Sequence, residues 1–421
     1  MNNKPSPSKE LIEKITKVYP TPFHLYSEQE LGRRARLLNR AFSWNDGFKE
    51  YYAVKACPTP GVIDVLRREG CGVDCASYCE LKLADAMGFR GEQIMFSSNE
   101  TPAGEFAYAK KLGAIINLDD FTMVDAVQNE CGMPEKVCLR YNPGGEIHLG
   151  NSVMGNPGES KFGMTREQIF EAAEKCLHLG AKEIALHAFL VSNTTDESYY
   201  PTNASVLMQL ALDLNRQLGC RIFMINLSGG VGIPYRPEEN EADIEQIGFL
   251  VKQKYQELLE KNGMCHVKMA SELGRYMSAS AGWLITQAIH EKNIYRHYIG
   301  VDACAADLMR PAMYGAYHHI TVAGKEDAPE TEMYDVVGSL CENNDKFAVN
   351  RLLPKVDIGD YLVIHDTGAH GRSMGYNYNG RLRCAEIMLR QDGSFELIRR
   401  AETPNDYFAT LDVCKNIPLF D

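Results

Sequence analysis

The chain has 421 residues, of which 45% are hydrophobic, and its formal net charge is −12. This length suggests two domains, or a barrel with a second module, around a large buried core. The acidic balance argues against a nucleic-acid-binding or membrane-surface protein. We find neither a basic, apolar leader nor a long apolar run, which predicts a cytoplasmic protein.

An amphipathic helix is predicted near the start, where Leu11, Ile12, Ile15 and Val18 share one face and Ser8 can cap it. From residue 51 to residue 275, eight short apolar segments then alternate with amphipathic helical stretches. Such consecutive units predict a closed parallel (β/α)8 barrel of the TIM type, with a doubly wound open sheet as the alternative. The expected strands are residues 51–56, 71–77, 93–98, 114–120, 136–142, 183–190, 223–230 and 266–275.

After residue 275 the segments are strand-like, with turns and few long helices between them. This pattern predicts a second, mostly antiparallel β domain. Its expected strands are residues 281–290, 298–304, 318–324, 360–366, 383–390 and 394–402. The predicted organisation is therefore an N-terminal segment, residues 1–35, that packs with the β domain, a barrel over residues 36–277, and the β domain over residues 278–421.

The thirteen cysteines are expected to be reduced thiols, as is usual for a protein without an export signal. Cys71, Cys75 and Cys79 have a spacing that suggests metal ligands. However, they lie on a predicted strand that runs into a helix, and no second Cys/His pair accompanies them. We therefore predict no metal site.

Polar residues gather at the expected C-terminal ends of the barrel strands, where barrels of this kind carry their chemistry. Each has an ordinary explanation when taken alone: a strand-end lysine usually snorkels, and a single histidine is usually a satisfied core residue. Their common placement instead favours one site. The residues are Lys55, Asp74 with Glu80, Arg140, His187, the Ser228–Gly232 run "SGGVG", and the Glu272–Arg275 run "ELGR".

This set of groups is chemically consistent with a single ligand. Glycine N–H groups can approach a phosphate, and a nearby arginine adds charge-assisted bonds. A carboxylate keeps a pyridine nitrogen protonated, a histidine stacks on a ring, and a lysine forms an imine. That combination is what an enzyme using pyridoxal phosphate requires.

From "YPTPFHLYSEQEL" to "ETPNDYFATL" the chain resembles the alanine-racemase-like class of pyridoxal phosphate enzymes, and within it the diaminopimelate decarboxylases. The resemblance implies that Lys55 of "YYAVKA" is the Schiff-base lysine and that His187 of "HAFL" stacks on the cofactor. It implies that Glu272 faces the pyridine nitrogen and that Arg275 serves phosphate or substrate. It further implies phosphate contacts from Gly229, Gly230 and Gly232. From their places at the strand ends, Asp74 and Gly274 are also expected to contact the cofactor.

The second domain resembles the part of these enzymes that recognises substrate. "MRPAMYGAYHHI" implies that Arg310 and Tyr314 bind the far end of the substrate. Independently of the resemblance, His318 and His319 are expected at the surface or an interface. "GSLCENND" implies a proton donor, Cys341, and an acidic substrate ligand, Glu342. Near the end of the chain, Tyr378 matches a tyrosine that contacts cofactor and substrate. The resemblance also implies a homodimer with shared sites, in which the cysteine loop reaches the partner's barrel.

Three departures from the family pattern stand out. Leu273 replaces the usual proline, and Ser228 replaces the first glycine of the phosphate loop. "HAFLVSN" lacks the small Gly-Ser pair that commonly follows the histidine, so Ser192 or another group would supply the phosphate hydroxyl.

The reaction implied is decarboxylation of meso-2,6-diaminopimelate to L-lysine. A racemase is less well matched, because members of that kind place an arginine where this chain has Glu272. A decarboxylase of D- or L-ornithine, lysine or arginine gains nothing from Arg310. A decarboxylase of D- or L-ornithine or lysine and a decarboxylase of a specialised-pathway amino acid remain the alternatives, whereas a non-catalytic homologue would not need both Lys55 and Cys341.

Overall fold

The computed structural model describes residues 4–145 and 156–411. The chain divides into two compact units. One comprises Gly32–Ile233 and Asn240–Met277; the other comprises the residues up to Leu31, Pro234–Glu239 and those from Ser278 onward. We retain the domain boundaries after residues 35 and 277 as a proposal. Among the helices in the described ranges, none is long and apolar enough to cross a membrane.

The first unit is a closed barrel of parallel strands, which confirms the predicted (β/α)8 fold and excludes the open sheet. Each strand pairs with the next along the chain, and the last returns to the first through the pairs Lys49–Ala270 and Glu50–Ser271. The strands are β2 (Lys49–Ala53), β3 (Gly72–Cys75), β4 (Ile94–Phe96), β5 (Ile115–Leu118), β6 (Lys136–Arg140), β7 (Glu183–His187), β8 (Ile222–Asn226) and β9 (Lys268–Ser271). All eight fall on expected strand segments, although β2 starts two residues earlier and ends three earlier than expected.

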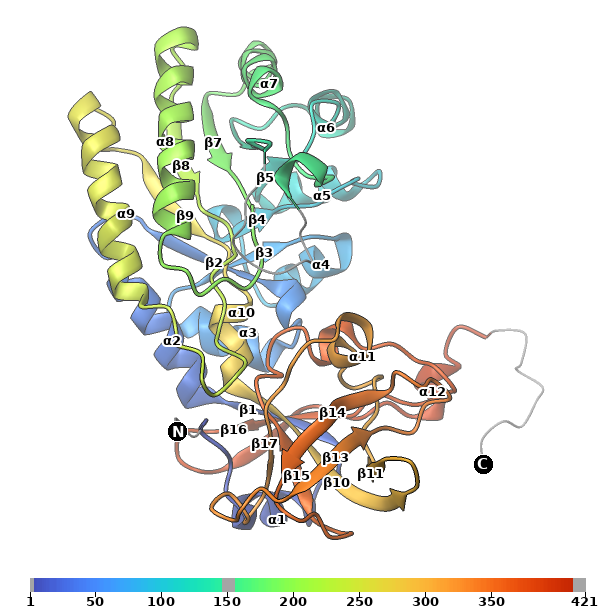
Figure 1. The fold of residues 1–421 in the computed structure, drawn as a ribbon. Helices are drawn as coiled ribbons and strands as arrows, with labels where there is room; N and C mark the ends of the chain where they lie inside the picture. The colour runs from blue at the N-terminus through green and yellow to red at the C-terminus, as the bar shows by residue number, and fades with distance from the viewer. Residues whose placement is uncertain (1–3, 146–155, 412–421) are drawn as a thin grey trace. The chain divides into compact units, whose positions relative to one another are not determined.

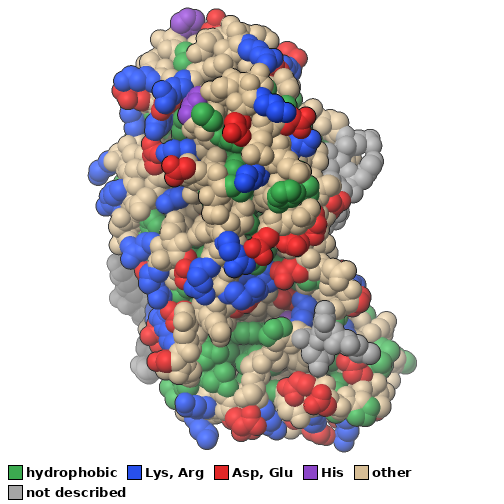
Figure 2. All heavy atoms as spheres, turned by 90° about the vertical axis from the view of Figure 1, so that its left-hand side faces the viewer, with side chains coloured by type: hydrophobic (Ala, Val, Ile, Leu, Met, Phe, Trp, Pro, Cys, Tyr) green, Lys and Arg blue, Asp and Glu red, His purple; other side chains and the backbone are tan. Residues whose placement is uncertain are grey.

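Helices alternate with these strands and lie outside them in Figure 1. Several begin at a side-chain cap: Ser77, Thr165 and Asp243 each accept a hydrogen bond from a backbone N–H of the first turn. The helices are α2 (Glu28–Ala41), α3 (Pro60–Arg68), α4 (Tyr78–Ala86), α5 (Glu105–Leu112), α6 (Met123–Cys131), α7 (Arg166–His178), α8 (Tyr199–Leu218), α9 (Ile244–Leu258) and α10 (Arg275–Ser278). On the barrel face that carries α9, basic and acidic side chains are interspersed (Figure 2), so the net negative charge forms no single acidic field there.

The interior of the barrel is closed by side chains from seven of its strands. Tyr51, Met95, Ile115, Cys138 and Ala185 belong to this buried cluster, together with residues of β8 and β9. The cluster fills the barrel as a packed core, so the chemistry is left to the residues that follow the strands.

The second unit is built on a mostly antiparallel sheet in the order β14-β13-β11-β10-β1-β16-β17, with β15 on β10 and β12 on β15. The pairs β1–β16 and β11–β13 are parallel. The strands are β1 (Phe23–Ser27), β10 (Gly282–Asn293), β11 (His297–Val301), β12 (Ile320–Val322), β13 (Glu332–Val337), β14 (Lys346–Leu353), β15 (Tyr361–Ile364), β16 (Ala385–Leu389) and β17 (Phe395–Arg399). Two short helices, α11 (Arg310–Tyr314) and α12 (Pro404–Tyr407), complete it.

The N-terminal part of the chain supplies an inner strand of this sheet. In Figure 1, β1 lies in blue among strands from the end of the chain. Helix α1 (Lys9–Thr16) is capped by Ser8 as predicted, and Ile12 and Ile15 pack into the same core as β1. Val18 lies beyond the helix and is exposed, so its predicted place on the apolar face is wrong.

Candidate active site

The carboxylate of Glu272, directly after β9, is the centre of a buried polar cluster at the ends of the barrel strands. Its Oε1 accepts hydrogen bonds from Asn226 Nδ2 at 2.7 Å and Ser97 Oγ at 3.2 Å. Its Oε2 accepts from Ser228 Oγ and His187 Nε2, each at 3.0 Å. The four donors come from the ends of β4, β7 and β8, so barrel closure brings them to one carboxylate.

The surroundings of Glu272 and Asp74 shift the pKa values of these two carboxyl groups in opposite directions. Burial favours a higher pKa for Glu272, but the attraction of His187 and Lys55 and the hydrogen bonds lower it to about 2. Burial raises the pKa of Asp74 well above its usual value, and repulsion from Glu272 raises it further. The same surroundings thus lower the pKa of Glu272 and raise the pKa of its neighbour Asp74.

Asp74→Asn is expected to be a mild change, because asparagine matches the shape of the side chain and the neutral form that its raised pKa favours. We expect kcat of the reconstituted enzyme to stay within about tenfold of the wild type, a change of about 1.4 kcal/mol or less in the barrier. Steady-state kinetics measures this, with Asp74→Ala as the comparison that also removes the side-chain volume. A loss of a thousandfold in Asp74→Asn would mean that Asp74 works as a carboxylate.

Lys55 was expected at the end of a strand, but it lies two residues beyond the last residue of β2. β2 ends at Ala53, and Lys55 is the middle residue of a 3₁₀ turn, η1 (Val54–Ala56). Its two neighbours are buried while its own side chain is exposed. Nζ lies 6.0 Å from the centre of the Phe189 ring and has no hydrogen-bond partner within residues 4–145 and 156–411. The turn therefore anchors the backbone and projects the amine.

The glycine run after β8 combines two free donors with tight packing. Within the described parts of the chain, the N–H groups of Gly229 and Gly230 make no hydrogen bond, whereas Gly232 N–H donates to the Thr194 carbonyl at 2.9 Å. Gly230 has a φ of +114°, and a Cβ there would lie 2.4 Å from a ring carbon of Tyr199. Gly229 and Gly230 thus offer donors to an anion, while the donor of Gly232 is already used.

Ser228, which replaces a glycine of the family pattern, has a left-handed backbone with a φ of 57°. Its hydroxyl donates to Glu272, so this departure strengthens the carboxylate cluster. Phe189 belongs to the "HAFLVSN" segment, which lacks the Gly-Ser pair of the family pattern. Its ring is close to the glycine run, because a Cβ on Gly229 would lie 3.4 Å from a ring carbon. A role for Ser192 as a phosphate ligand stays a prediction.

Other residues expected near the site have structural partners. Glu80 accepts from Ala76 N at 2.6 Å at the start of α4. Gly274 packs so closely that a Cβ would lie 2.8 Å from that of Ala56. Arg275 begins α10 and is partly buried.

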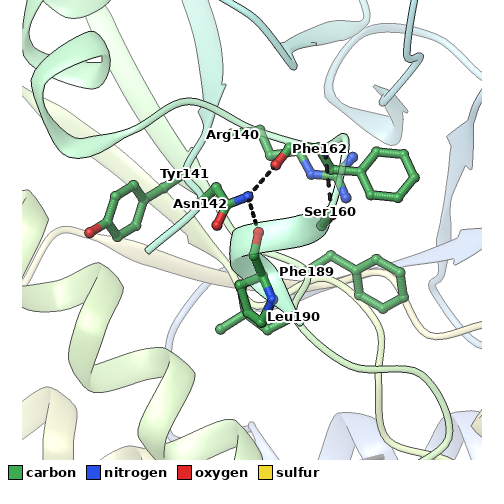
Figure 3. Close-up of a pocket in the computed structure, with 8 residues that line it drawn as sticks. Arg140, Tyr141, Asn142, Ser160, Phe162, Phe189 and Leu190 are labelled. Carbon is green, nitrogen blue, oxygen red and sulfur yellow. Dashed lines mark hydrogen bonds between the residues drawn. The ribbon is translucent and has the colours of Figure 1, made fainter. Parts of the chain in front are cut away.

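A small pocket beside the ends of β6 and β7 adjoins this cluster (Figure 3). Arg140 lies in its wall, where Nη1 donates to the buried Asp119 at 2.8 Å and the guanidinium stands 4.5 Å from the centre of the Phe162 ring. Asn142 closes the pocket by donating to the carbonyls of Pro157 and Phe162, at 2.9 and 2.8 Å. The lining is Arg140, Tyr141, Asn142, Pro157, Ser160, Phe162, Phe189 and Leu190.

In the second unit, the loop that carries Cys341 is held by side chains of its own unit. Asn379 Oδ1 accepts from Cys341 N at 2.6 Å, and Asp345 Oδ2 accepts from the preceding N–H at 2.8 Å. The neighbouring Glu342 is exposed, as are Cys341 and Tyr378. The hydrogen bond from Cys341 to Asn379 ties the cysteine loop to the segment that contains Tyr378.

Arg310, at the start of α11, is buried and contacts Tyr235 and His318. Its Nη1 lies 2.9 Å from both Tyr235 Oη and His318 Nε2. His318 Nδ1 donates to the His365 carbonyl at 2.8 Å, so Nε2 is free of hydrogen and accepts from Arg310. The prediction that His318 lies at the surface is wrong, because these partners satisfy it in the core. Tyr314, at the other end of α11, is exposed.

Sequence reasoning missed several residues of the cluster. Ser97 and Asn226 hold Glu272, and Phe189 faces Lys55. Their signal was polar or aromatic residues at the ends of predicted strands, in "MFSS", "INLSGG" and "HAFL". That signal does not tell which strand ends meet.

The barrel cluster fits a pyridoxal phosphate group. An ionised buried carboxylate matches a protonated ring nitrogen, two glycine N–H groups match a phosphate, and a lysine amine matches an aldehyde carbon. Among the buried polar atoms that lack a hydrogen-bond partner within the described residues, three belong to this cluster: Asp74 Oδ1, Asn117 Oδ1 and His187 Nδ1. Unsatisfied buried polar atoms at one site point to a polar ligand.

The family model described as pyridoxal-dependent decarboxylase, pyridoxal binding domain, matches residues 28–279. The chain therefore belongs to the pyridoxal-dependent decarboxylases, and its cofactor is pyridoxal phosphate. Within that class it is an amino-acid decarboxylase.

Relatives of known name extend over nearly the whole chain. Protein TabA of Pseudomonas amygdali pv. tabaci is 40% identical, over 94% of this chain and 92% of that protein. The diaminopimelate decarboxylase of Methanothermobacter thermautotrophicus is 34% identical, over 92% and 91%. The crystal structure of diaminopimelate decarboxylase from Helicobacter pylori complexed with L-lysine matches with a TM-score of 0.86 at 26% identity, over 94% and 98%.

Proposed function

We propose that the protein removes CO2 from meso-2,6-diaminopimelate and forms L-lysine, the last step of a lysine biosynthesis. The observation that carries the proposal is the buried Arg310, an immobilised guanidinium in the segment expected to meet the far end of the substrate. The 34% identity to a diaminopimelate decarboxylase supports it. Diaminopimelate has a carboxylate at each end, which a fixed guanidinium can bind through two parallel hydrogen bonds.

The barrel residues hold the cofactor in this proposal. Lys55 provides the amine that bonds to it, and Gly229 and Gly230 donate their N–H groups to its phosphate. Glu272 holds the proton of the ring nitrogen, while His187 and Asp74 line the ring. Pyridoxal phosphate, when bound, supplies a ring that accepts the electron pair released as CO2 departs.

The second unit supplies the proton and the substrate contacts. As the bond to CO2 breaks, the Cys341 thiol gives a proton to the α-carbon, which forms the new C–H bond. Glu342 binds the far amine, and Arg310 binds the far carboxylate. Tyr314, Tyr378 and Arg275 complete the proposed substrate site.

Arg310→Met is expected to raise KM for meso-diaminopimelate by about 10²-fold, because charge-assisted hydrogen bonds to the far carboxylate are lost. The effect on kcat should be smaller, since this carboxylate lies away from the reacting carbon. Kinetics of the variant measures both. Arg296→Met is the matched control, because that arginine pairs with Asp335 in the same unit. An unchanged KM in Arg310→Met would contradict the proposed role.

We also propose a cytoplasmic homodimer with shared sites. Cys341, Glu342 and Tyr378 are exposed in the single chain, although they are the groups expected to meet a buried reacting centre. A second copy would enclose them.

Mixing two inactive variants tests the shared sites. Lys55→Ala and Cys341→Ala homodimers should each be inactive, while mixed dimers carry one intact site. After subunit exchange we expect about a quarter of wild-type activity, because half of the dimers are mixed and each has one of two sites intact. Activity that stays at the level of the separate variants would show that each chain builds its own site.

A related amino acid of a specialised pathway is the second candidate substrate. It stays a candidate because the identity to Protein TabA, whose name specifies no substrate, is 40%, against 34% for the diaminopimelate decarboxylase of M. thermautotrophicus.

A further inference from the structure

Glu50 is a buried carboxyl group to which the proposed mechanism gives no role. It is the second residue of β2, and only 1% of its surface is exposed. Its Oε1 accepts from Leu273 N at 2.8 Å, and its Oε2 is hydrogen-bonded to the Ser271 hydroxyl. Burial raises the pKa of Glu50 well above its ordinary value, and repulsion from Glu272 and Asp74 adds to the effect. Burial therefore favours the protonated form of this carboxyl group.

Both hydrogen-bond partners of Glu50 are sequence neighbours of Glu272. Ser271 precedes it and Leu273 follows it, so one side chain is bonded to the Ser271 hydroxyl before that carboxylate and to the Leu273 backbone N–H after it. Glu50 and Ser271 are also register partners where β2 and β9 close the barrel. Glu50 thus connects the strand that leads to Lys55 with the strand that leads to Glu272.

The partner at residue 273 is one of the departures noted in the sequence. Where the resembled motif has proline, this chain has Leu273, and only a residue other than proline has an N–H to donate. A proline would also restrict the backbone of the preceding residue, which here is Glu272. With leucine in place of proline, the backbone of Glu272 loses this restriction. Leu273 also adds a buried N–H, which requires a hydrogen-bond acceptor. Glu50 supplies the acceptor.

We propose that Glu50 is a positioning residue for Glu272, and that Glu50 and Leu273 are a coupled pair that takes the place of a proline-restricted turn. The pair holds the Ser271–Leu273 backbone so that the Glu272 carboxylate stays within reach of its four donors. The proposal rests on the role proposed for Glu272, and it is independent of which amino acid is the substrate.

Four variants of the full-length enzyme loaded with pyridoxal phosphate test the pair: Glu50→Gln, Glu50→Leu, Leu273→Pro and the double variant Glu50→Leu/Leu273→Pro. Asn45→Ala is the matched control, because Asn45 is hydrogen-bonded to the start of β9, whereas Glu50 is hydrogen-bonded to its end. Asn45 Oδ1 accepts from Met269 N at 2.8 Å, and Nδ2 donates to the Val267 carbonyl at 3.2 Å. The two readouts are Tm and the pH at which the absorbance of the bound cofactor changes.

Glu50→Gln should match the wild type in both readouts, because glutamine keeps the shape of the side chain and an acceptor for the Leu273 N–H. Glu50→Leu and Leu273→Pro should each lower Tm and lower the absorbance midpoint by about one pH unit, since a displaced Glu272 holds the ring proton less well. The double variant should recover most of that midpoint shift. Asn45→Ala should lower Tm and leave the midpoint unchanged.

Two results would overturn the proposal. One is a lower Tm with an unchanged midpoint in Glu50→Leu, which would make Glu50 purely structural. The other is a double variant whose midpoint shift is the sum of the two single shifts, which would mean that the residues are not coupled. If Glu50→Leu does not fold, Leu273→Pro and Glu50→Gln decide the question through the same midpoint. If the wild type binds the cofactor but releases no CO2 from meso-diaminopimelate, the proposed substrate is wrong. The comparison of the Glu50 and Leu273 variants would remain valid, because it measures the cofactor without substrate.

Discussion

Lys55→Ala is expected to abolish the covalent attachment of pyridoxal phosphate and to lower kcat by about 10⁴-fold. The amine stands on a rigid 3₁₀ turn, with a buried residue on each side, and faces the Phe189 ring. Its charge also stabilises the ionised form of Glu272 and Asp74. No other lysine or amine of the described barrel cluster occupies this place, so a second amine should not substitute for it.

Borohydride reduction followed by mass spectrometry measures the attachment. Wild-type protein should retain the mass of the cofactor on the peptide containing Lys55, and Lys55→Ala should retain none. Lys49→Ala is the matched control, because Lys49 begins the same strand. Cofactor retained after reduction of Lys55→Ala would place the covalent bond on another residue.

Glu272→Gln is expected to lower kcat by about 10²–10³-fold, because a neutral amide no longer stabilises a protonated ring nitrogen. The cause should be visible without substrate. Removing the Glu272 charge removes the repulsion that raises the pKa of Asp74, so that pKa should fall in the variant. Infrared spectra of the carboxyl groups follow the change. A variant with wild-type kcat would mean that the ring nitrogen does not depend on this carboxylate.

The same variant gives a stability test with a defined sign. The pKa of Glu272 is about 2 in the folded protein, below the usual value for glutamate of about 4.3. Its ionised form therefore stabilises the fold above about pH 4.3, and this contribution is lost as the pH falls toward 2. Between about pH 4.3 and about pH 2, Tm of the wild type should fall more steeply than Tm of Glu272→Gln. Parallel curves would contradict the charged state assigned to Glu272.

The barrel was predictable because each β/α unit leaves a local pattern, and all eight strands were located. β1 was missed because five residues between two helices give a weak signal until their partners β10 and β16 are known. β13 and β14 were missed because one face is open: Met333 and Leu352 are opposite each other and both are exposed. Half-exposed strands with mixed polarity do not stand out in a sequence.

The candidate site was predictable residue by residue, but its connections were not. Glu272 was expected to face a ring nitrogen. Its hydrogen bonds from Asn226 and Ser97 could not be predicted, because they depend on which strand ends lie together in the closed barrel. His318 was placed wrongly because a histidine pair looks polar in sequence. In the fold, its two nitrogens are satisfied by Arg310 and a backbone carbonyl.

The most direct test of the central claim is CO2 release by the purified protein with pyridoxal phosphate, measured separately with meso-diaminopimelate, L-lysine, L-ornithine, D-lysine and D-ornithine. We expect release with meso-diaminopimelate alone, with an equal amount of L-lysine formed. Release from an amino acid with a single carboxylate, and none from meso-diaminopimelate, would keep the decarboxylase chemistry and contradict the role of Arg310. No release from any of them would contradict the proposed function.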